Sequence, residues 1–291
     1  MDWQKGENSD NVEQGSGGGG GFRPGGVHIG LGGLLILVVL SLVFKRDLVT
    51  PFLGGDSGVQ QTSGQAQPTQ AVDCRNPADQ QVAFVCRILG STEKTWGDYF
   101  ASMGKTYTDP RLHLFQGQVD TACGAASTAV GPFYCPGDRK IYLDLDFFLE
   151  LQDRFHASGD FARAYVIAHE VGHHVQNLLG VFDKVRQWQR QGYPMDGADG
   201  LSVRQELQAD CFAGVWANRT QQRLDWLQPG DVESALNAAS QIGDDTLQRA
   251  ARGTVVPDSF THGTSAQRVK WFKAGMASGD INSCNTFSGD P

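Results

Sequence analysis

The pattern His-Glu-x-x-His in the middle of the chain has the residue types and spacing of a metal-dependent hydrolase. His169 and His173 are four residues apart within a largely apolar run, residues 162–180, and this run predicts a helix. On a helix, that spacing places both imidazoles on one face, where they can bind a single zinc ion. Glu170 is displaced from that face, so its carboxylate could take a proton from a water molecule beside the metal and act as a general base.

A histidine pair in an ordinary core helix is the alternative interpretation. The helix is otherwise largely apolar, and two histidines flanking a glutamate would be costly to bury without a partner for their polar atoms. One zinc ion per chain would be that partner. His174 directly follows His173 and should point away from the ligand face, so we expect it to support the site or the core.

A catalytic zinc also needs a third protein ligand and an open position for water. The best candidate is Glu206, which lies in residues 203–218, a second predicted helix. Asp210 lies one turn further along the same face and could hydrogen-bond the outer nitrogen of a ligating histidine. Without the His-Glu-x-x-His pattern, this pair of carboxylates would be typical of a solvated helix face.

The elements that would position these residues are mainly helices. The helix that carries the two histidines should end near Gly180, a suitable C-terminal cap. Helical spacing also predicts two helices upstream, Ala83–Leu89 and Thr95–Met103. Residues 133–143 predict a β-hairpin, because Pro-Gly-Asp-Arg separates two short β-prone segments. We therefore expect an α+β fold, mostly helical, with a small antiparallel sheet or hairpin beside the zinc helix.

The predicted hairpin has two possible roles. An exposed edge strand could hydrogen-bond an extended peptide and hold it across the metal. Simple structural support for the zinc helix is the alternative.

The first quarter of the chain has the composition of a tether. Residues 1–26 contain an unbroken glycine run and few large apolar side chains, so we expect them to be disordered. Residues 27–44 are apolar, Gly or Ser apart from one histidine, and predict one transmembrane helix near the lower end of the about 17 to 25 residues that a span needs. Residues 45–71 predict a flexible linker, so the folded domain should comprise residues 72–291.

A cleaved signal peptide is the alternative for the apolar segment. The long acidic segment that precedes it is a poor n-region and no small-x-small cleavage site follows it, which favours an anchor. Basic residues flank the segment on both sides, so charge alone does not determine its orientation.

All six cysteines follow the apolar segment, and an even number favours disulfides in an oxidising compartment. Buried free thiols or a Cys-rich metal site are the alternatives, although no C-x-x-C pair is present. We therefore expect a single-pass membrane protein with its catalytic domain in the periplasm. Nearness in sequence suggests that Cys74 pairs with Cys86 and that Cys123 pairs with Cys135. The two remaining cysteines, Cys211 and Cys284, would then pair with each other.

The overall composition argues against a nucleic-acid partner. The formal net charge is −8, and no Lys/Arg stretch forms the basic face that phosphate contacts need. The hydrophobic share of 40% is enough for a substantial core.

The site residues resemble known metallopeptidases. The stretch His169-Glu-Val-Gly-His173 followed by Glu206-Leu-Gln-Ala-Asp210 resembles the HExxH plus ExxAD pattern of gluzincins. Nearly the whole chain is similar to the bacterial putative neutral zinc metallopeptidases. This resemblance implies a zinc peptidase that acts on a peptide or protein. The segments that also carry it are Asp2-Trp3, Ser9-Asp-Asn-Val12, the glycine tract with the apolar segment, Thr121-Ala-Cys-Gly, Gly131-Pro-Phe-Tyr-Cys-Pro136 and Phe260-Thr-His-Gly263.

A second resemblance concerns the residues that could stabilise negative charge. Residues 261–268 resemble the Thr-His-Pro...Arg stretch of the membrane CAAX-type endopeptidases, with Gly263 in place of the proline. The resemblance implies that His262 or Arg268 donates a hydrogen bond to the oxyanion that develops during hydrolysis. A loop histidine near a helix cap is the alternative.

The sequence therefore predicts a membrane-anchored zinc peptidase. His169, His173 and Glu206 would hold the metal, and Glu170 would transfer the proton. The competing hypothesis is a membrane-tethered interaction protein whose zinc or disulfides only stabilise an extracytoplasmic domain. The glutamate argues against it, because a structural zinc site would more often use a fourth protein ligand.

Overall fold

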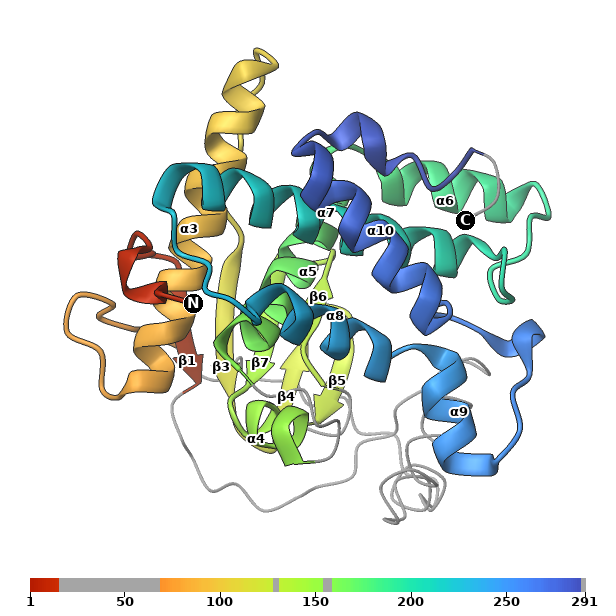
Figure 1. Cartoon of the computed structure of the whole chain (residues 1–291), viewed down its shortest axis with the longest axis horizontal. Coiled ribbons are helices and arrows are strands. Elements are labelled where there is room, and N and C mark those ends of the chain that lie inside the picture. Colours follow the sequence, from red (N-terminus) through yellow and green to blue (C-terminus); the bar gives the residue numbers. More distant parts are fainter. Residues whose placement is uncertain (16–68, 128–130, 154–158, 289–291) are drawn as a thin grey trace, which may run out of the picture.

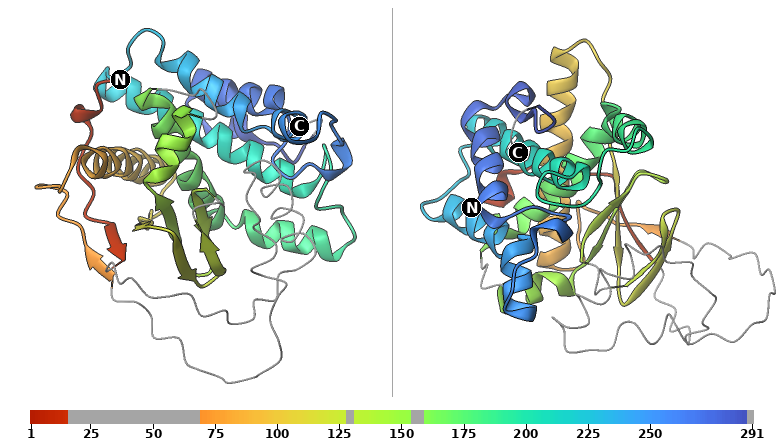
Figure 2. Two further views of the ribbon diagram at one scale, coloured as in Figure 1. Left: turned by 90° about the horizontal axis from the view of Figure 1, so that it is seen from below. Right: turned by 90° about the vertical axis from the view of Figure 1, so that its right-hand side faces the viewer.

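Helices pack along one side of a five-stranded sheet (Figures 1 and 2). The computed structural model describes residues 1–15, 69–127, 131–153 and 159–288. The helices are α3 (Gln80–Ser102), α4 (Asp146–Asp153), α5 (Asp160–Leu178), α6 (Val181–Arg190), α7 (Leu201–Leu224), α8 (Asp231–Gln241), α9 (Asp244–Arg252) and α10 (Ser265–Ser278), with short 3-10 turns at Trp3–Lys5, Pro257–Ser259 and Ile281–Cys284. The strands are β1 (Val12–Gly15), β2 (Thr69–Ala71), β3 (Arg111–Phe115), β4 (Gln118–Thr121), β5 (Gly124–Ser127), β6 (Phe133–Cys135) and β7 (Lys140–Asp144).

The main sheet is mixed, which corrects the expected antiparallel arrangement. Its order is β2-β1-β3-β7-β6. The three inner strands are mutually parallel, whereas β2 and β6 pair antiparallel at the two edges. The predicted hairpin is confirmed, because β6 pairs with β7 through Phe133 opposite Tyr142 and Cys135 opposite Lys140. Parallel neighbours need long connections, so strands that are distant in the sequence form the centre of the sheet.

The first fifteen residues are folded, so the prediction that residues 1–26 are disordered is wrong for residues 1–15, while residues 16–26 lie outside the described residues. Val12 is 1% exposed and begins β1, which lies between β2 and β3. The ring of Trp3 packs edge to face on Phe84 of α3, with ring centroids 5.6 Å apart. The glycine run dominates the composition of residues 1–26 and conceals these few apolar anchors, which are enough because the rest of the fold completes their environment.

The predicted membrane anchor and most of the predicted linker lie outside the described residues. The transmembrane prediction falls on residues 27–44, and the described part of the linker, residues 69–71, forms strand β2. Among the residues that the structure describes, no helix combines the length and the apolar character needed to cross a membrane.

Helix α3 is continuous, although the sequence predicted two shorter helices in its place. The side chain of Asp79 caps its first turn by accepting a hydrogen bond from the backbone N–H of Val82. The intervening Ser91 and Thr92 are weak helix formers, but both are buried and their hydroxyls donate to backbone carbonyls three residues earlier. Tertiary burial therefore overrides the low local propensity of this stretch.

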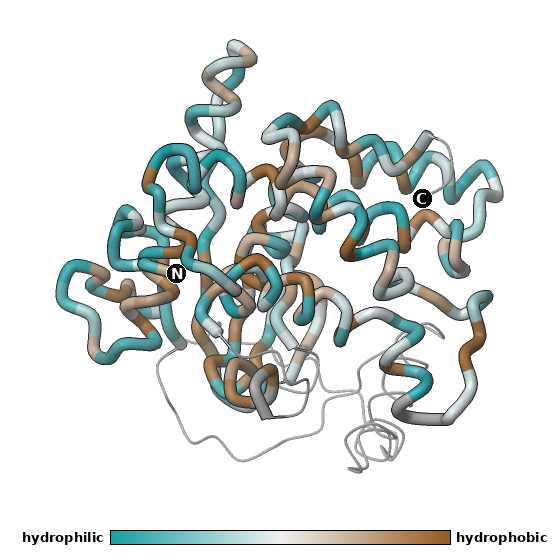
Figure 3. The backbone as a smooth tube through the Cα atoms, in the orientation of Figure 1, coloured by the Kyte–Doolittle hydropathy of each residue, from teal (hydrophilic) through white to brown (hydrophobic). Residues whose placement is uncertain are grey.

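The core lies where α3, α5 and α7 meet. Trp96 of α3 packs against Phe212 of α7 with ring centroids 5.6 Å apart, and Phe161 of α5 stacks on Trp216. All four rings are 0 to 1% exposed. Figure 3 shows hydrophobic stretches in the middle of the molecule and others nearer its edges, while the protruding end of α3 is mostly white or teal.

All three predicted disulfides are present. Cys74–Cys86 joins the segment after β2 to α3, and Cys123–Cys135 joins the β4–β5 turn to β6. Cys211–Cys284 joins α7 to the C-terminal 3-10 turn. Each of these bonds therefore links a loop or turn to a helix or strand with a buried cysteine.

Helices α7 and α10 touch through glycines. A methyl group on Gly275 would be 1.9 Å from the carbonyl oxygen of Cys211, and one on Gly214 would be 2.1 Å from the carbonyl oxygen of Phe272. Only residues without a side chain fit at this crossing. This contact brings α10 against the helix that carries Glu206 and Asp210.

Candidate metal centre

The two helices of the site cross closely because of a glycine inside the His-Glu-x-x-His pattern. Helices α5 and α7 confirm the two predicted helices, and Gly180 ends α5 in the left-handed conformation. A methyl group on Gly172 would be 2.9 Å from the carbonyl oxygen of Ala209. The backbone of α7 can therefore approach the histidine face of α5 closely.

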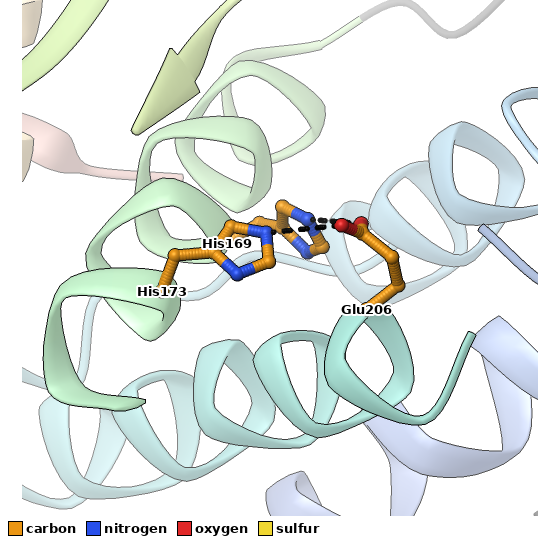
Figure 4. Close-up of side chains that lie close together, drawn as sticks. All are labelled: His169, His173 and Glu206. Atoms are coloured by element: carbon orange, nitrogen blue, oxygen red, sulfur yellow. Dashed lines mark hydrogen bonds and ion pairs between the residues drawn. The ribbon is translucent and has the colours of Figure 1, made fainter. Parts of the chain in front are cut away.

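Three side chains converge at this crossing (Figure 4). The Nε2 atom of His169 is 3.2 Å from one carboxylate oxygen of Glu206, and the Nε2 atom of His173 is 3.4 Å from the other. One ligand atom from each residue lies within 4.8 Å of the others. Within the described ranges, this is the only group of three or more His, Cys, Asp or Glu residues that could hold a metal ion.

A buried ionic network holds the outer nitrogen of His169. Its Nδ1 is 2.9 Å from Oδ1 of Asp210, which is 0% exposed. Tyr165 donates its hydroxyl proton to the same carboxylate, and Arg268 donates from Nε and Nη2, at 2.9 Å each. The strong pairing with Arg268 outweighs burial and lowers the pKa of Asp210 to about 2. The carboxylate is therefore ionised, and it fixes the imidazole orientation.

The outer nitrogen of His173 is held by Gln176, a residue that the sequence analysis did not single out. Nδ1 of His173 is 2.9 Å from Oε1 of Gln176. The amide nitrogen of Gln176 in turn donates to the carbonyl of Gln205 at 2.7 Å and to the side chain of Gln208 at 3.2 Å. The only sequence signal was that Gln176 lies three residues after His173 on the same helix.

The surroundings of the two rings favour a metal cation. Because each Nδ1 faces an oxygen acceptor, each ring would keep a proton there in its neutral form, which leaves Nε2, the atom next to Glu206, available to bind a metal ion. Burial lowers the pKa of His169, but Asp210 and Glu206 together raise it to about 10. The site therefore stabilises positive charge strongly, and two imidazole nitrogens with a carboxylate are a donor set that suits zinc.

Glu170 lies beside the three candidate ligands without belonging to their group. It is 7% exposed, and burial raises the pKa of its carboxyl although the two histidine rings counteract the shift. Glu206 shows the opposite balance, because the histidines lower its pKa well below the ordinary value despite burial. The two glutamates of the site thus have different electrostatic environments.

His262 and Arg268 occupy different positions relative to the ligands. Arg268 is 2% exposed and directs its donors toward Asp210, Tyr165 and the carbonyl of Ile242. The side chain of His262 is 44% exposed, and Nδ1 lies 3.3 Å from Asp244. Burial lowers the pKa of His262, but Asp244 and the negative charge of Glu206 raise it above the ordinary value.

The loop that carries His262 is held by one carboxylate. Asp244 accepts the backbone N–H groups of residues 261–263 at 2.6 to 3.0 Å. Thr264 then begins α10 with a reciprocal capping box formed with Gln267.

His174 points away from the candidate ligands, as its position in the helix predicted. It is 0% exposed, and its ring contacts the carbonyl of Thr108 at 2.7 Å and the hydroxyl of Tyr134 at 3.1 Å. Burial lowers its pKa to about 4. It therefore joins α5 to the loop before β3 and to β6 as a neutral side chain.

Known proteins resemble this chain over about three quarters of its length or more. A family model described as "Putative neutral zinc metallopeptidase" matches residues 1–287. The chain is 48% identical to "Uncharacterized protein YpfJ" of Escherichia coli (strain K12), with 99% of each chain covered. It is 45% identical over 228 residues, 74% of each chain, to "Uncharacterized protein Rv2575" of Mycobacterium tuberculosis (strain ATCC 25618 / H37Rv). No solved structure matches.

Proposed function

Because this chain belongs to the putative neutral zinc metallopeptidase family, we propose that it hydrolyses peptide bonds with one zinc ion and a glutamate general base. The convergence of His169, His173 and Glu206 at the crossing of α5 and α7 carries this proposal. Each histidine has its outer nitrogen satisfied and its inner nitrogen directed at the carboxylate, as metal ligation requires.

The proposed roles follow from what each side chain can do. His169, His173 and Glu206 would hold the metal. When bound, zinc supplies a Lewis acid that lowers the pKa of water and polarises a carbonyl. Glu170 takes a proton from the attacking water as the new C–O bond forms, and it returns that proton to the amine as the C–N bond breaks.

Two further residues have supporting roles in the proposal. His262 is partly exposed and can donate a hydrogen bond to the developing oxyanion, because Asp244 holds its other nitrogen. Arg268 is a positioning residue, since its donors are engaged with Asp210 and Tyr165. The substrate class is a peptide or protein, and the three disulfides support an oxidising compartment.

The proposal is tested with two variants of the full chain, since residues 1–15 are part of the sheet. Glu170→Gln should keep about one zinc per chain and lose cleavage of a mixed peptide library by at least about 100-fold. Glu206→Ala should lose most of its zinc. Glu233→Ala, which removes an exposed acid on α8, is the control and should resemble the wild type.

The outcomes separate the possible functions. Wild-type rates in Glu170→Gln would rule out the general base. Full zinc in Glu206→Ala would move the third ligand elsewhere. A wild-type chain that binds zinc but cleaves no peptide would favour an interaction protein with a non-catalytic metal site.

A further inference from the structure

We propose that residues 1–15 lie on the same side of the membrane as the metal centre. The apolar segment 27–44 lies between these residues and strand β2, and a single crossing there would put the two parts on opposite sides. The described contacts require both parts in one folded unit. Residues 1–15 and the metal centre therefore lie on one side of any membrane that the protein contacts.

Strand β1 is an inner strand of the sheet. It pairs with β2 on one side and with β3 on the other. Val12 and Glu13 are 1% and 5% exposed, and the carboxylate of Glu13 binds both Lys140 of β7 and His113 of β3. Without β1, these groups and the pairing edge of β3 would lose their partners.

The segment that precedes β1 is bound to α3 and α7. The hydroxyl of Ser9 donates to Glu93 at 2.7 Å, and Glu7 forms an ion pair with Arg223 of α7. A methyl group on Gly90 would be 2.2 Å from the carbonyl oxygen of Glu7. Helix α3 therefore carries a glycine at the point where the N-terminal segment crosses it.

One contact ties the N-terminal segment to a disulfide. The backbone N–H of Ser9 donates to the carbonyl of Cys86 at 3.1 Å, and Cys86 is bonded to Cys74. Disulfides form and persist in oxidising compartments. Ser9 must therefore lie in the same oxidising compartment as this disulfide. The rest of the domain lies there too, because it contains the other two disulfides. This placement of Ser9 does not depend on any catalytic activity of the protein.

The experiment places thiols at two exposed positions that face each other across β1 and β2. Gln14 and Gln70 are exposed partners in the antiparallel register, and directly opposite residues have a Cα separation that a disulfide can span, about 4.5 to 5.5 Å. The natural cysteines are all paired. The double variant Gln14→Cys/Gln70→Cys is therefore made in the full chain and expressed in Escherichia coli.

Two readouts are taken from these cells. Peptide mapping without reduction should show positions 14 and 70 joined in most chains. The control Gln14→Cys/Gln191→Cys should remain largely unjoined, because exposed Gln191 follows α6, across the molecule from β1 (Figure 1). In the single variants, a membrane-impermeant thiol reagent applied to spheroplasts should label both positions or neither, and it should label both after permeabilisation.

The outcomes decide the proposal. The cross-link, or concordant labelling of the two single variants, supports one compartment. Labelling of the thiol at position 70 in spheroplasts, with the thiol at position 14 reached only after permeabilisation and no cross-link formed, would overturn the proposal and restore the single-span arrangement.

Discussion

At the candidate metal centre the two histidines are held by acceptors of different charge. Asp210 binds His169 and is itself paired with Arg268, whereas the neutral amide of Gln176 binds His173. Both acceptors fix the rings with Nε2 next to Glu206, so each should contribute to metal affinity although neither belongs to the candidate ligand set.

Replacing Gln176 tests this role. Gln176→Leu removes the acceptor for Nδ1 of His173, so zinc affinity should fall by roughly 10 to 100-fold, measured by competition with a chelating dye. Gln176→Glu keeps the oxygen acceptor for His173 but loses the amide donor to Gln205, so its zinc affinity should lie between that of Gln176→Leu and that of the wild type.

Asn177→Leu is the matched control for this prediction. It removes an amide from the next residue of α5, where the side chain donates to Tyr134 and not to a ligand. Its zinc affinity should match that of the wild type. An equal loss in Asn177→Leu and Gln176→Leu would show that the effect is one of general packing.

At the scale of elements, the position of α10 depends on its glycine contact with α7. Gly214 and Gly275 let the two backbones meet, and this contact sets Arg268 of α10 against Asp210 of α7. The electrostatic environment of His169 thus depends on a steric contact between α7 and α10 that involves none of the candidate metal ligands.

Gly275→Ala should destabilise the protein although alanine is the better helix former. The added methyl would lie 1.9 Å from the carbonyl oxygen of Cys211, so the helices must separate at a cost of about 1 to 3 kcal/mol, more than the about 1 kcal/mol that alanine gains in propensity. Chemical denaturation of the disulfide-intact protein measures the difference.

Gly97→Ala on α3 is the contrasting substitution. Nothing lies within 4 Å of a methyl at this position, so stability should stay constant or rise by up to about 1 kcal/mol. If Gly275→Ala raised stability to the same extent, the close helix contact would be wrong.

At the scale of the whole molecule, the N-terminal segment joins the helices to the sheet. It contributes β1, and its ammonium group at Met1 forms an ion pair with Asp231 of α8. Its contact with α3 includes Glu93, which accepts hydrogen bonds from Ser9 and Asn11. Burial, reinforced by nearby acidic groups, raises the pKa of Glu93 to about 7.

This raised pKa predicts that stability falls as pH rises. The folded protein keeps the proton of Glu93 up to a pKa of about 7, whereas the unfolded chain loses it near the ordinary value of 4.5. Unfolding therefore releases a proton in this window, and the free energy of unfolding should fall by up to about 3 kcal/mol between the two values. Denaturation midpoints across this pH range measure the change.

Glu93→Gln assigns the effect. The amide keeps an oxygen acceptor for Ser9 and Asn11 but does not titrate, so this part of the pH dependence should disappear and stability above neutral pH should exceed that of the wild type. Asp98→Asn, an exposed carboxylate on the same helix, should follow the wild-type profile. An unchanged slope in Glu93→Gln would assign the dependence to other groups.

The sequence alone determined the features that depend on local spacing. Residues four apart on a helix share a face in any fold, so His169 with His173, and Glu206 with Asp210, could be recognised as pairs. The same reasoning located the hairpin of β6 and β7 and the short-range disulfides. Each of these features depends only on residues that are close together in the sequence.

Only the tertiary structure decided the features that depend on distant partners. Val12 becomes part of a strand because Leu112 lies beside it, and composition averaged over a glycine tract does not reveal that partner. The acceptor of His173 and the glycine contacts of α7 likewise depend on how helices cross. Burial and backbone pairing between remote segments supply most of the free energy at these places, and they exist only once the chain has folded.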